Sequence, residues 1–351
     1  MPGQPYDALL VLSFGGPEKP DDVIPFLENV LRGRNVPRER MLEVAEHYYH
    51  FGGKSPINDQ NRALILGIES ELARQGPRLP VYWGNRNWHP FLADTLRKMQ
   101  ADGIRNALAF VTSVFSSYSG CRQYLEDIDK ARAEVGPDAP NVRKLRSFYN
   151  HPLFIEAQAG EVRDALDKIP TDRRANVQVL FTAHSVPVAM AETSDYQKQL
   201  NESCRLVSEH LGLPGWRLVY QSRSGPPTQP WLEPDIGSVL TEMPSGADVI
   251  IVPIGFVSDH MEVLYDLDTE ARQICEDRGL NMVRASTVGV HPLFLAMIRE
   301  LICERMGQVP ARAIGQYGPS HDDCDPACCP APARRASSAL SDSSPRAIAQ
   351  R

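Results

Sequence analysis

The chain has 351 residues, of which 42% are hydrophobic, and its formal net charge at pH 7 is −7. This length exceeds that of a typical single domain, so we expect two domains with apolar cores. The acidic balance and the lack of a basic run argue against a nucleic-acid-binding protein. No apolar stretch approaches the roughly 20 residues that span a bilayer, and the N-terminus lacks the basic segment of a signal peptide. A cytoplasmic protein without a transmembrane segment is therefore expected.

Buried strands alternate with helices through the first half of the chain. Short β-branched runs are typical of buried parallel strands, and the amphipathic stretches between them predict helices. The expected strands cover 7–14, 80–84, 107–115 and 142–148, and the expected helices cover 21–32, 39–49, 59–74, 91–102 and a stretch that ends near 134.

The second half repeats this order. Its expected strands cover 177–181, 217–220, 248–257 and 281–284, with helices over 194–211, near 234–241 and after 257. The segment HPLF occurs at 151–154 and again at 291–294, each time after the fourth strand of its half and at the start of a helix. The first half carries an extra helical insertion that includes Val36–Ser55.

This alternation predicts an α/β protein with two similar Rossmann-like domains. Each domain would be a four-stranded parallel sheet flanked by helices, with an active cleft between the two. We place the first domain at 1–150 and the second at 151–315. A cysteine-containing tail covers 316–351, and we expect disorder after about residue 330, because that Pro/Ala/Ser tract cannot bury a core.

A histidine and several acidic residues follow neighbouring strands of the second half. His184 ends the first strand of that half, and His260 and Glu262 follow the third. The first and third strands of a doubly wound sheet lie side by side, so His184 and Glu262 should face each other. Glu262, Asp266 and Glu270 recur every four residues and share one helix face. This row is either a solvated acidic face or a track for a hydrated divalent cation, and its place at a strand end favours the cation.

The strand ends of the first half offer hydroxyl groups and flat apolar side chains. The hydroxyls belong to Ser55, Tyr118, Ser119 and Tyr124, and the aromatic residues are Phe14, Phe51, Trp83 and Trp88. Each aromatic residue taken singly is explained more simply as part of the core. Together they would suit a large planar ligand with acidic edges.

Several segments together resemble the ferrochelatases. They are LLVLSFGGPE, FGGKSPIN, GNRNWHPF, VLFTAHSVP, QSRSGPP and PIGFVSDHMEVLYDLD. The resemblance covers about residues 6–315 and is closest to the bacterial coproporphyrin ferrochelatases of the actinobacterial type. It implies the same pair of Rossmann-like domains. It also implies an enzyme of haem biosynthesis that inserts Fe²⁺ into a free-base porphyrin, with coproporphyrin III as the expected substrate and coprohaem as the product.

The resemblance further implies roles for individual residues. The family's catalytic, iron-holding pair falls on His184 and Glu262, its porphyrin-contacting pair on Ser55 and Tyr124, and its acidic metal-delivery row on Asp266 and Glu270. A histidine suits the removal of the two pyrrole protons, because its pKa lies near neutrality. Phe14 stands where some members have a tyrosine, so a phenolate contact to the iron of the product is not available at that position.

Cysteines concentrate in the tail, at Cys324, Cys328 and Cys329. Three thiols in six residues of a protein from a reducing compartment indicate metal or cluster binding. The resemblance implies a [2Fe–2S] cluster, since actinobacterial relatives carry one on tail cysteines and one internal cysteine. Cys121 is the expected fourth ligand and Cys204 a weaker candidate. Zinc bound with the help of His321 and free tail thiols are the alternatives.

Two other classes of function remain open. The chain could be a tetrapyrrole or metal carrier without turnover, or a chelatase for Co²⁺ or Ni²⁺. The His184/Glu262 pair favours an enzyme, because a carrier needs no base. Protoporphyrin IX is the alternative substrate. The expected partners are the porphyrin and Fe²⁺, and a downstream enzyme of the haem pathway is a candidate protein partner.

Overall fold

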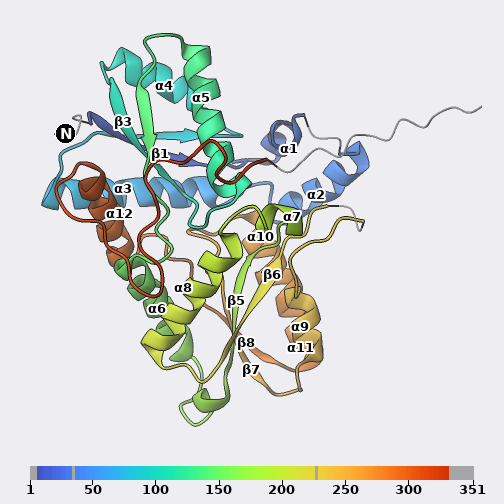
Figure 1. Ribbon diagram of the computed structural model, residues 1–351. Helices are drawn as coiled ribbons and strands as arrows, with labels where there is room; N and C mark the ends of the chain where they lie inside the picture. The colour runs from blue at the N-terminus through green and yellow to red at the C-terminus, as the bar shows by residue number, and fades with distance from the viewer. Residues whose placement is uncertain (1–5, 34–35, 226–227, 332–351) are drawn as a thin grey trace, which may run out of the picture.

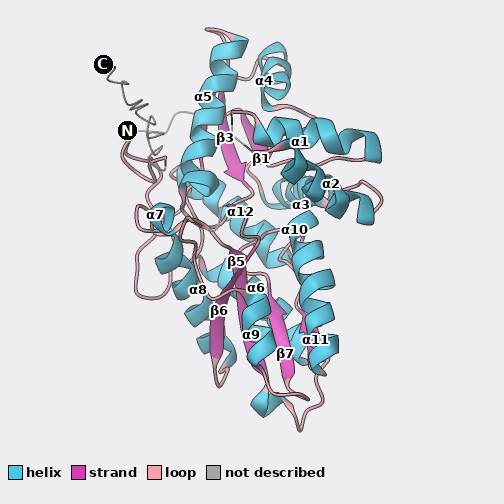
Figure 2. Cartoon of the chain, turned by 90° about the vertical axis from the view of Figure 1, so that its right-hand side faces the viewer, coloured by secondary structure: helices cyan, strands magenta, loops and turns pink. Residues whose placement is uncertain are grey.

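The computed structural model describes residues 6–33, 36–225 and 228–331. Its strands form two four-stranded parallel sheets, which Figures 1 and 2 show one above the other. The first sheet has the order β2-β1-β3-β4 and the second the order β6-β5-β7-β8. The strands are β1 (Ala8–Ser13), β2 (Val81–Asn85), β3 (Asn106–Val111), β4 (Asn141–Lys144), β5 (Gln178–His184), β6 (Trp216–Gln221), β7 (Asp248–Val252) and β8 (Asn281–Arg284). The predicted α/β fold with two similar sheets is confirmed.

Helices connect the strands in both halves. In the first half they are η1 (Pro20–Asp22), α1 (Val23–Leu31), α2 (Arg38–His50), α3 (Ile57–Gln75), α4 (Leu92–Ala101), η2 (Tyr118–Arg122) and α5 (Gln123–Val135). In the second half they are α6 (Pro152–Leu166), η3 (Arg174–Asn176), α7 (Val188–Ala191), α8 (Tyr196–Leu211), α9 (Ile236–Glu242), α10 (Met261–Val263), η4 (Leu264–Ala271), α11 (Arg272–Arg278) and α12 (Pro292–Arg305). The expected insertion is present as α1 and α2, which pack on each other through Val23, Phe26 and Met41.

Three strands, β3, β4 and β7, end at least four residues earlier than the sequence predicts. Phe115, Phe148 and Val257, which lie beyond their ends, are still buried. Apolar character reports burial and not strand pairing, so it cannot mark where pairing stops. Pro253 also has no N–H to donate to a neighbouring strand.

The two halves share one apolar core. Side chains from both sheets belong to a single buried cluster, including Val11 and Phe110 from the first sheet and Phe181 and Ile250 from the second. The repeated HPLF segments explain part of this continuity. Phe154 and Phe294 lie 6.4 Å apart between ring centroids, and the histidine of each segment caps its helix by accepting the Leu153 or Leu293 N–H at Nδ1. The boundary at residue 150 stays a prediction, since α12 packs on α3 as well as on α6.

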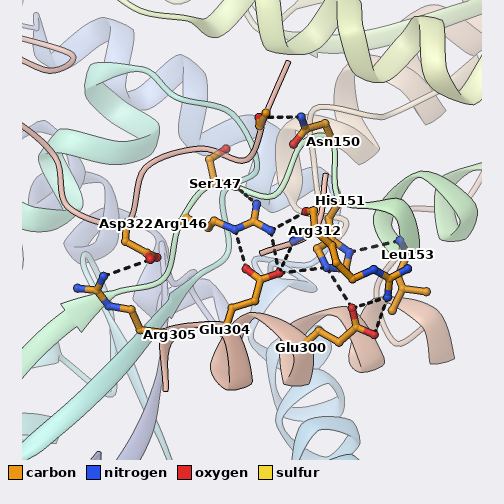
Figure 3. Close-up of polar contacts among 11 residues, drawn as sticks. Arg146, Ser147, Asn150, His151, Leu153, Glu300, Glu304, Arg305, Arg312 and Asp322 are labelled. Carbon is orange, nitrogen blue, oxygen red and sulfur yellow. Dashed lines mark hydrogen bonds and ion pairs between the residues drawn. The ribbon is translucent and has the colours of Figure 1, made fainter. Parts of the chain in front are cut away.

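A buried ion network fixes the segment after α12 against the body of the protein (Figure 3). Arg146 donates to both carboxylate oxygens of Glu304, at 2.8 and 3.0 Å, and also to the carbonyl oxygen of Arg312. Arg312 in turn pairs with Glu300. Burial, together with Arg146 and Arg312, lowers the pKa of His151 to about 3, so this histidine stays neutral inside the network. The predicted disorder after about residue 330 concerns residues 332–351, which lie outside the described part.

Candidate functional site

His184 and Glu262 meet at the carboxyl edge of the second sheet. His184 is the last residue of β5, and Glu262 lies in α10, which follows β7, the neighbour of β5 in the sheet. The His184 Nε2 atom lies 3.6 Å from Glu262 Oε2, with 32% and 48% of the two side chains exposed. The contact predicted from strand adjacency is therefore present, and solvent can reach both groups.

The backbone around His184 decides which ring nitrogen faces the carboxylate. Nδ1 lies 2.5 Å from the carbonyl oxygen of Ser185. Because a carbonyl only accepts hydrogen bonds, Nδ1 carries the proton and Nε2 is the atom that gains or loses one. The Tyr196 hydroxyl donates to the carbonyl oxygen of His184 at 2.9 Å and holds the end of the strand.

The pair is mutually stabilised as an imidazolium and a carboxylate. Burial alone would lower the pKa of His184, but the charge and hydrogen bond of Glu262, the Ser185 carbonyl and the Asp266 charge together outweigh it, so the net effect raises this pKa. Burial alone would raise the pKa of Glu262, but His184 and His260 outweigh it and lower this pKa to about 2. Burial lowers the pKa of His260. Its Nδ1 accepts the Glu262 N–H at 3.2 Å and caps the start of α10.

The acidic row continues along a wide helical turn. The expected single α-helix is divided into α10, the π-helix η4 and α11, and η4 carries Asp266 and Glu270. Burial, with the charges of Glu262 and Glu270, raises the pKa of Asp266 to about 7. Burial and Asp235 also raise the pKa of Glu270. Near neutral pH Asp266 therefore exists in both protonation states, as suits a group that exchanges a proton for a cation.

Ser222 and Gln221 support Asp266, a role that the sequence analysis did not predict for either residue. The Ser222 hydroxyl and the Gln221 amide donate to Asp266 Oδ2. The Gln221 amide also donates to the carbonyl oxygen of Glu262 at 3.3 Å. Ser222 has φ of +60°, a left-handed conformation that costs a non-glycine residue energy. In this backbone conformation the Ser222 hydroxyl contacts Asp266 of the acidic row. The sequence alone does not show that Ser222 adopts it.

The insertion helix α2 of the first half lies against this acidic face. The His47 and Tyr265 rings are stacked, with centroids 3.7 Å apart. Burial and the Glu262 charge raise the pKa of Tyr48, so the Tyr48 phenol stays neutral beside the site. Phe14 is 37% exposed, and its ring meets Phe26 at a centroid distance of 6.2 Å.

The other predicted substrate contacts are buried. Ser55 is only 2% exposed and sits behind Gly16, where an added Cβ would come within 2.8 Å of the Ser55 Cβ. Tyr124 is 5% exposed, and the Arg86 guanidinium lies 4.4 Å from its ring centroid while paired with Asp127. Neither residue reaches the surface beside His184 as the chain stands.

Cysteines from distant parts of the chain gather near η2. Cys121 Sγ lies 3.9 Å from Cys324 Sγ, and Cys328 Sγ lies 3.7 Å from Cys329 Sγ. Two thiolates on one tetrahedral metal with bonds of about 2.3 Å are about 3.8 Å apart, so each pair fits the edge of one such centre. Two such edges fit a two-iron cluster held by four thiolates. Among the sulfur contacts of the described residues Cys204 takes no part, and it is fully buried in the apolar core.

His321 is the other candidate ligand at the cysteine site. Its Nε2 lies 3.7 Å from Cys328 Sγ, and its ligand atom falls within 4.8 Å of those of Cys324 and Cys328. The hydrogen bond from Cys324 lowers the pKa of Cys121 to about 5. Arg122 donates to the carbonyl oxygens of Asp325 and Cys328 and holds the tail loop in place.

Comparisons with known proteins agree on one family. The family model described as Ferrochelatase matches residues 6–306. A ferrochelatase of Rhodopirellula baltica is 59% identical over 329 residues, covering 93% of each chain. A coproporphyrin III ferrochelatase of Nocardia farcinica is 50% identical, covering 95% of this chain and 99% of its own. A cobalt-bound sirohydrochlorin chelatase structure from Bacillus subtilis matches with a TM-score of 0.52 at 11% identity, covering 86% and 96% of the two chains, and is similar in fold. In the part of the chain that the structure describes, every helix is too short or too polar to cross a membrane.

Proposed function

Because this chain belongs to the ferrochelatase family, we propose that it inserts Fe²⁺ into the free-base ring of coproporphyrin III, yielding the iron porphyrin and two protons. Relatives 50% and 48% identical over almost the whole chain are named coproporphyrin III ferrochelatases, which supports this substrate over protoporphyrin IX. The observation that carries the chemistry is the 3.6 Å approach of His184 Nε2 to Glu262 beside the acidic row.

The charges at the site indicate an order of events. While Glu262 is a free carboxylate, it holds a proton on His184, because it raises that pKa. Fe²⁺ would arrive along Asp266 and Glu270 and then bind Glu262. Its positive charge neutralises the carboxylate of Glu262. The pKa of His184 then falls, so the imidazole loses its proton and becomes a base when the metal is present. Nε2 can then accept the pyrrole protons, and the ring nitrogens replace the oxygen ligands of the iron.

The porphyrin is proposed to lie between α2 with Phe14 on one side and His184 on the other. Exposed Phe14 offers apolar surface to the macrocycle. Ser55 and Tyr124 remain proposed contacts to the porphyrin edge. Since both are buried, they would bind only after side chains such as Arg86 move. The cytoplasmic location and a downstream haem-pathway enzyme as partner also stay predictions.

We further propose that Cys121, Cys324, Cys328 and Cys329 hold a [2Fe–2S] cluster. The two sulfur–sulfur distances near the tetrahedral edge support two metal centres. A cluster of this kind supplies one-electron redox chemistry when bound. The alternative is a zinc ion held by His321, Cys324 and Cys328, whose ligand atoms lie close enough together to bind one ion. Iron, sulfide and zinc analysis of protein purified without oxygen separates the two, and Cys204→Ser serves as the control that should retain the metal.

The chelatase proposal is tested by anaerobic Fe²⁺ insertion, followed as loss of free-base porphyrin fluorescence. Coproporphyrin III and protoporphyrin IX are compared at matched concentrations. We expect faster turnover of coproporphyrin III, and a loss of about 10²-fold or more in kcat for His184→Ala with unchanged porphyrin affinity. Tight porphyrin binding without insertion of Fe²⁺, Co²⁺ or Ni²⁺ would instead identify a carrier. Insertion of Co²⁺ or Ni²⁺ but not Fe²⁺ would identify a different chelatase.

A further inference from the structure

The turn that carries the proposed metal ligand is held from both halves of the chain at one residue, Asp259. The backbone N–H of Asp259 donates to Gln60 Oε1 at 2.7 Å. Gln60 belongs to α3 of the first half, whereas Asp259 directly precedes His260 and stands three residues before Glu262. A contact over 199 positions of sequence therefore ends at the turn that positions Glu262.

Gln60 is presented by a rigid part of α3. Its neighbour Asn58 is fully buried and donates to the carbonyl oxygen of Gly16 at 3.0 Å. Asn61, 1% exposed, donates to the Ser13 hydroxyl at 2.8 Å. These two bonds tie the first turns of α3 to the end of β1 and to the loop that follows it. Gln60 lies between these two anchored residues, so its bond to Asp259 links the turn to a well-fixed part of the first half.

The side chain of Asp259 is held on its other side by the second half. Arg284, at the end of β8, places NH1 and NH2 each 3.2 Å from one Asp259 oxygen. The Nε of the same guanidinium donates to Asp268 Oδ1 of η4 at 2.8 Å. Arg284 thus joins the turn before Glu262 to η4, the helix that carries Asp266. Its side chain is only 15% exposed, so water weakens these bonds little.

We propose that Gln60 and Arg284 are positioning residues for metal insertion, which together hold Asp259 and so keep Glu262 in register with His184 and Asp266. This role rests on the proposed chelatase function. The register matters because a displacement of about 1 Å between reacting groups costs up to 10²-fold in rate. Neither residue touches the reacting atoms, and both act through the turn at Asp259.

The test compares Gln60→Met, which keeps the length and removes the acceptor, with Gln60→Glu, which keeps an acceptor oxygen at the same reach. For Gln60→Met we expect kcat/KM for Fe²⁺ to fall about tenfold, with porphyrin affinity unchanged. Gln60→Glu should retain most of the activity. Asp59→Asn is the matched control, because its ion pairs with Lys54 and Arg62 stay within the first half.

Arg284→Met should reproduce the Gln60→Met effect, and the double variant should lose less than the product of the two, since both act through Asp259. A wild-type kcat/KM for Fe²⁺ in Gln60→Met would overturn the proposal. An equal loss of porphyrin affinity, or a lowered Tm with unchanged kinetics, would also overturn it in favour of a purely structural role. Failure of the wild-type protein to insert Fe²⁺ would reject the chelatase function itself.

Discussion

The His47 imidazole lies flat on the Tyr265 phenol ring, with 3.7 Å between centroids and 7° between planes. The two residues belong to α2 of the insertion and to the π-helix η4, so the stack joins the two halves beside the acidic row. If the porphyrin enters next to α2, as proposed, it passes or displaces this contact. We therefore expect the stack to act as a latch, meaning a contact that holds α2 against η4.

Opening the latch should speed porphyrin exchange. A stacked aromatic pair contributes about 0.5–1.5 kcal/mol, so we expect His47→Ala to raise porphyrin association and dissociation rates about two- to tenfold. Stopped-flow fluorescence quenching measures both rates. His50→Ala is the control, because the aromatic contact of that ring is with Phe51, the residue that directly follows α2, and not with η4. Equal rates in wild type and His47→Ala would show that α2 does not restrict entry.

Removing the charge of Glu262 should lower the pKa of His184. In Glu262→Gln the shape is kept but the carboxylate is lost. Burial then dominates, and this histidine should titrate below its ordinary value of 6.5. NMR titration of the histidine ring nitrogens reports this directly. The acid limb of any residual insertion activity should move to lower pH as well. An unmoved His184 titration would mean that the pair is not coupled, contrary to the proposed order of events.

Asp266 should make the protein less stable as pH rises. Its pKa is about 7 when folded and 3.8 when unfolded, so between about pH 4 and pH 7 the folded state binds more protons than the unfolded state. Stability from this group is full below pH 4 and is lost as pH rises through 7. Urea unfolding across this range should show a downward trend that Asp266→Asn flattens. The same trend in Asp266→Asn would assign the pH dependence to other groups.

Lys144 should set the reduction potential of the proposed cluster. It is only 9% exposed, and its Nζ donates to the carbonyl oxygen of Leu145. No ion pair of the described residues includes it, whereas its charge helps to lower the pKa of Cys121 and opposes the rise in the pKa of Cys324 that Cys121 and burial cause. A buried ammonium needs a counter-charge, and thiolate ligands provide one. Lys144→Met should shift the midpoint potential to more negative values.

The potential is followed by electron paramagnetic resonance during an anaerobic redox titration. Lys130→Met, an exposed lysine on α5, is the control that should leave it unchanged. A cluster of normal spectrum with an unshifted potential in Lys144→Met would contradict the role of this lysine. The absence of any cluster from the wild-type protein would reject the cluster itself.

Much of the fold followed from local patterns. Short β-branched runs such as Val249–Val252 marked the strands, because burial on both faces requires continuous apolar character. The meeting of His184 and Glu262 also followed, since β5 and β7 had to be neighbours in a doubly wound sheet. The HPLF repeat identified the helix starts correctly, although its phenylalanines proved to pack together in the shared core.

The sequence by itself determined the two parallel sheets and the order of strands and helices along the chain, since these depend on the periodicity of apolar residues. It also determined which residue types carry the chemistry, since these follow the ends of neighbouring strands. Only the tertiary structure decided what depends on exact backbone path. It placed the Ser222 hydroxyl on Asp266 through a left-handed residue, buried Ser55 and Tyr124, and joined Gln60 to Asp259. Such contacts join residues far apart along the chain, and the free energy that selects them comes from packing of the whole molecule.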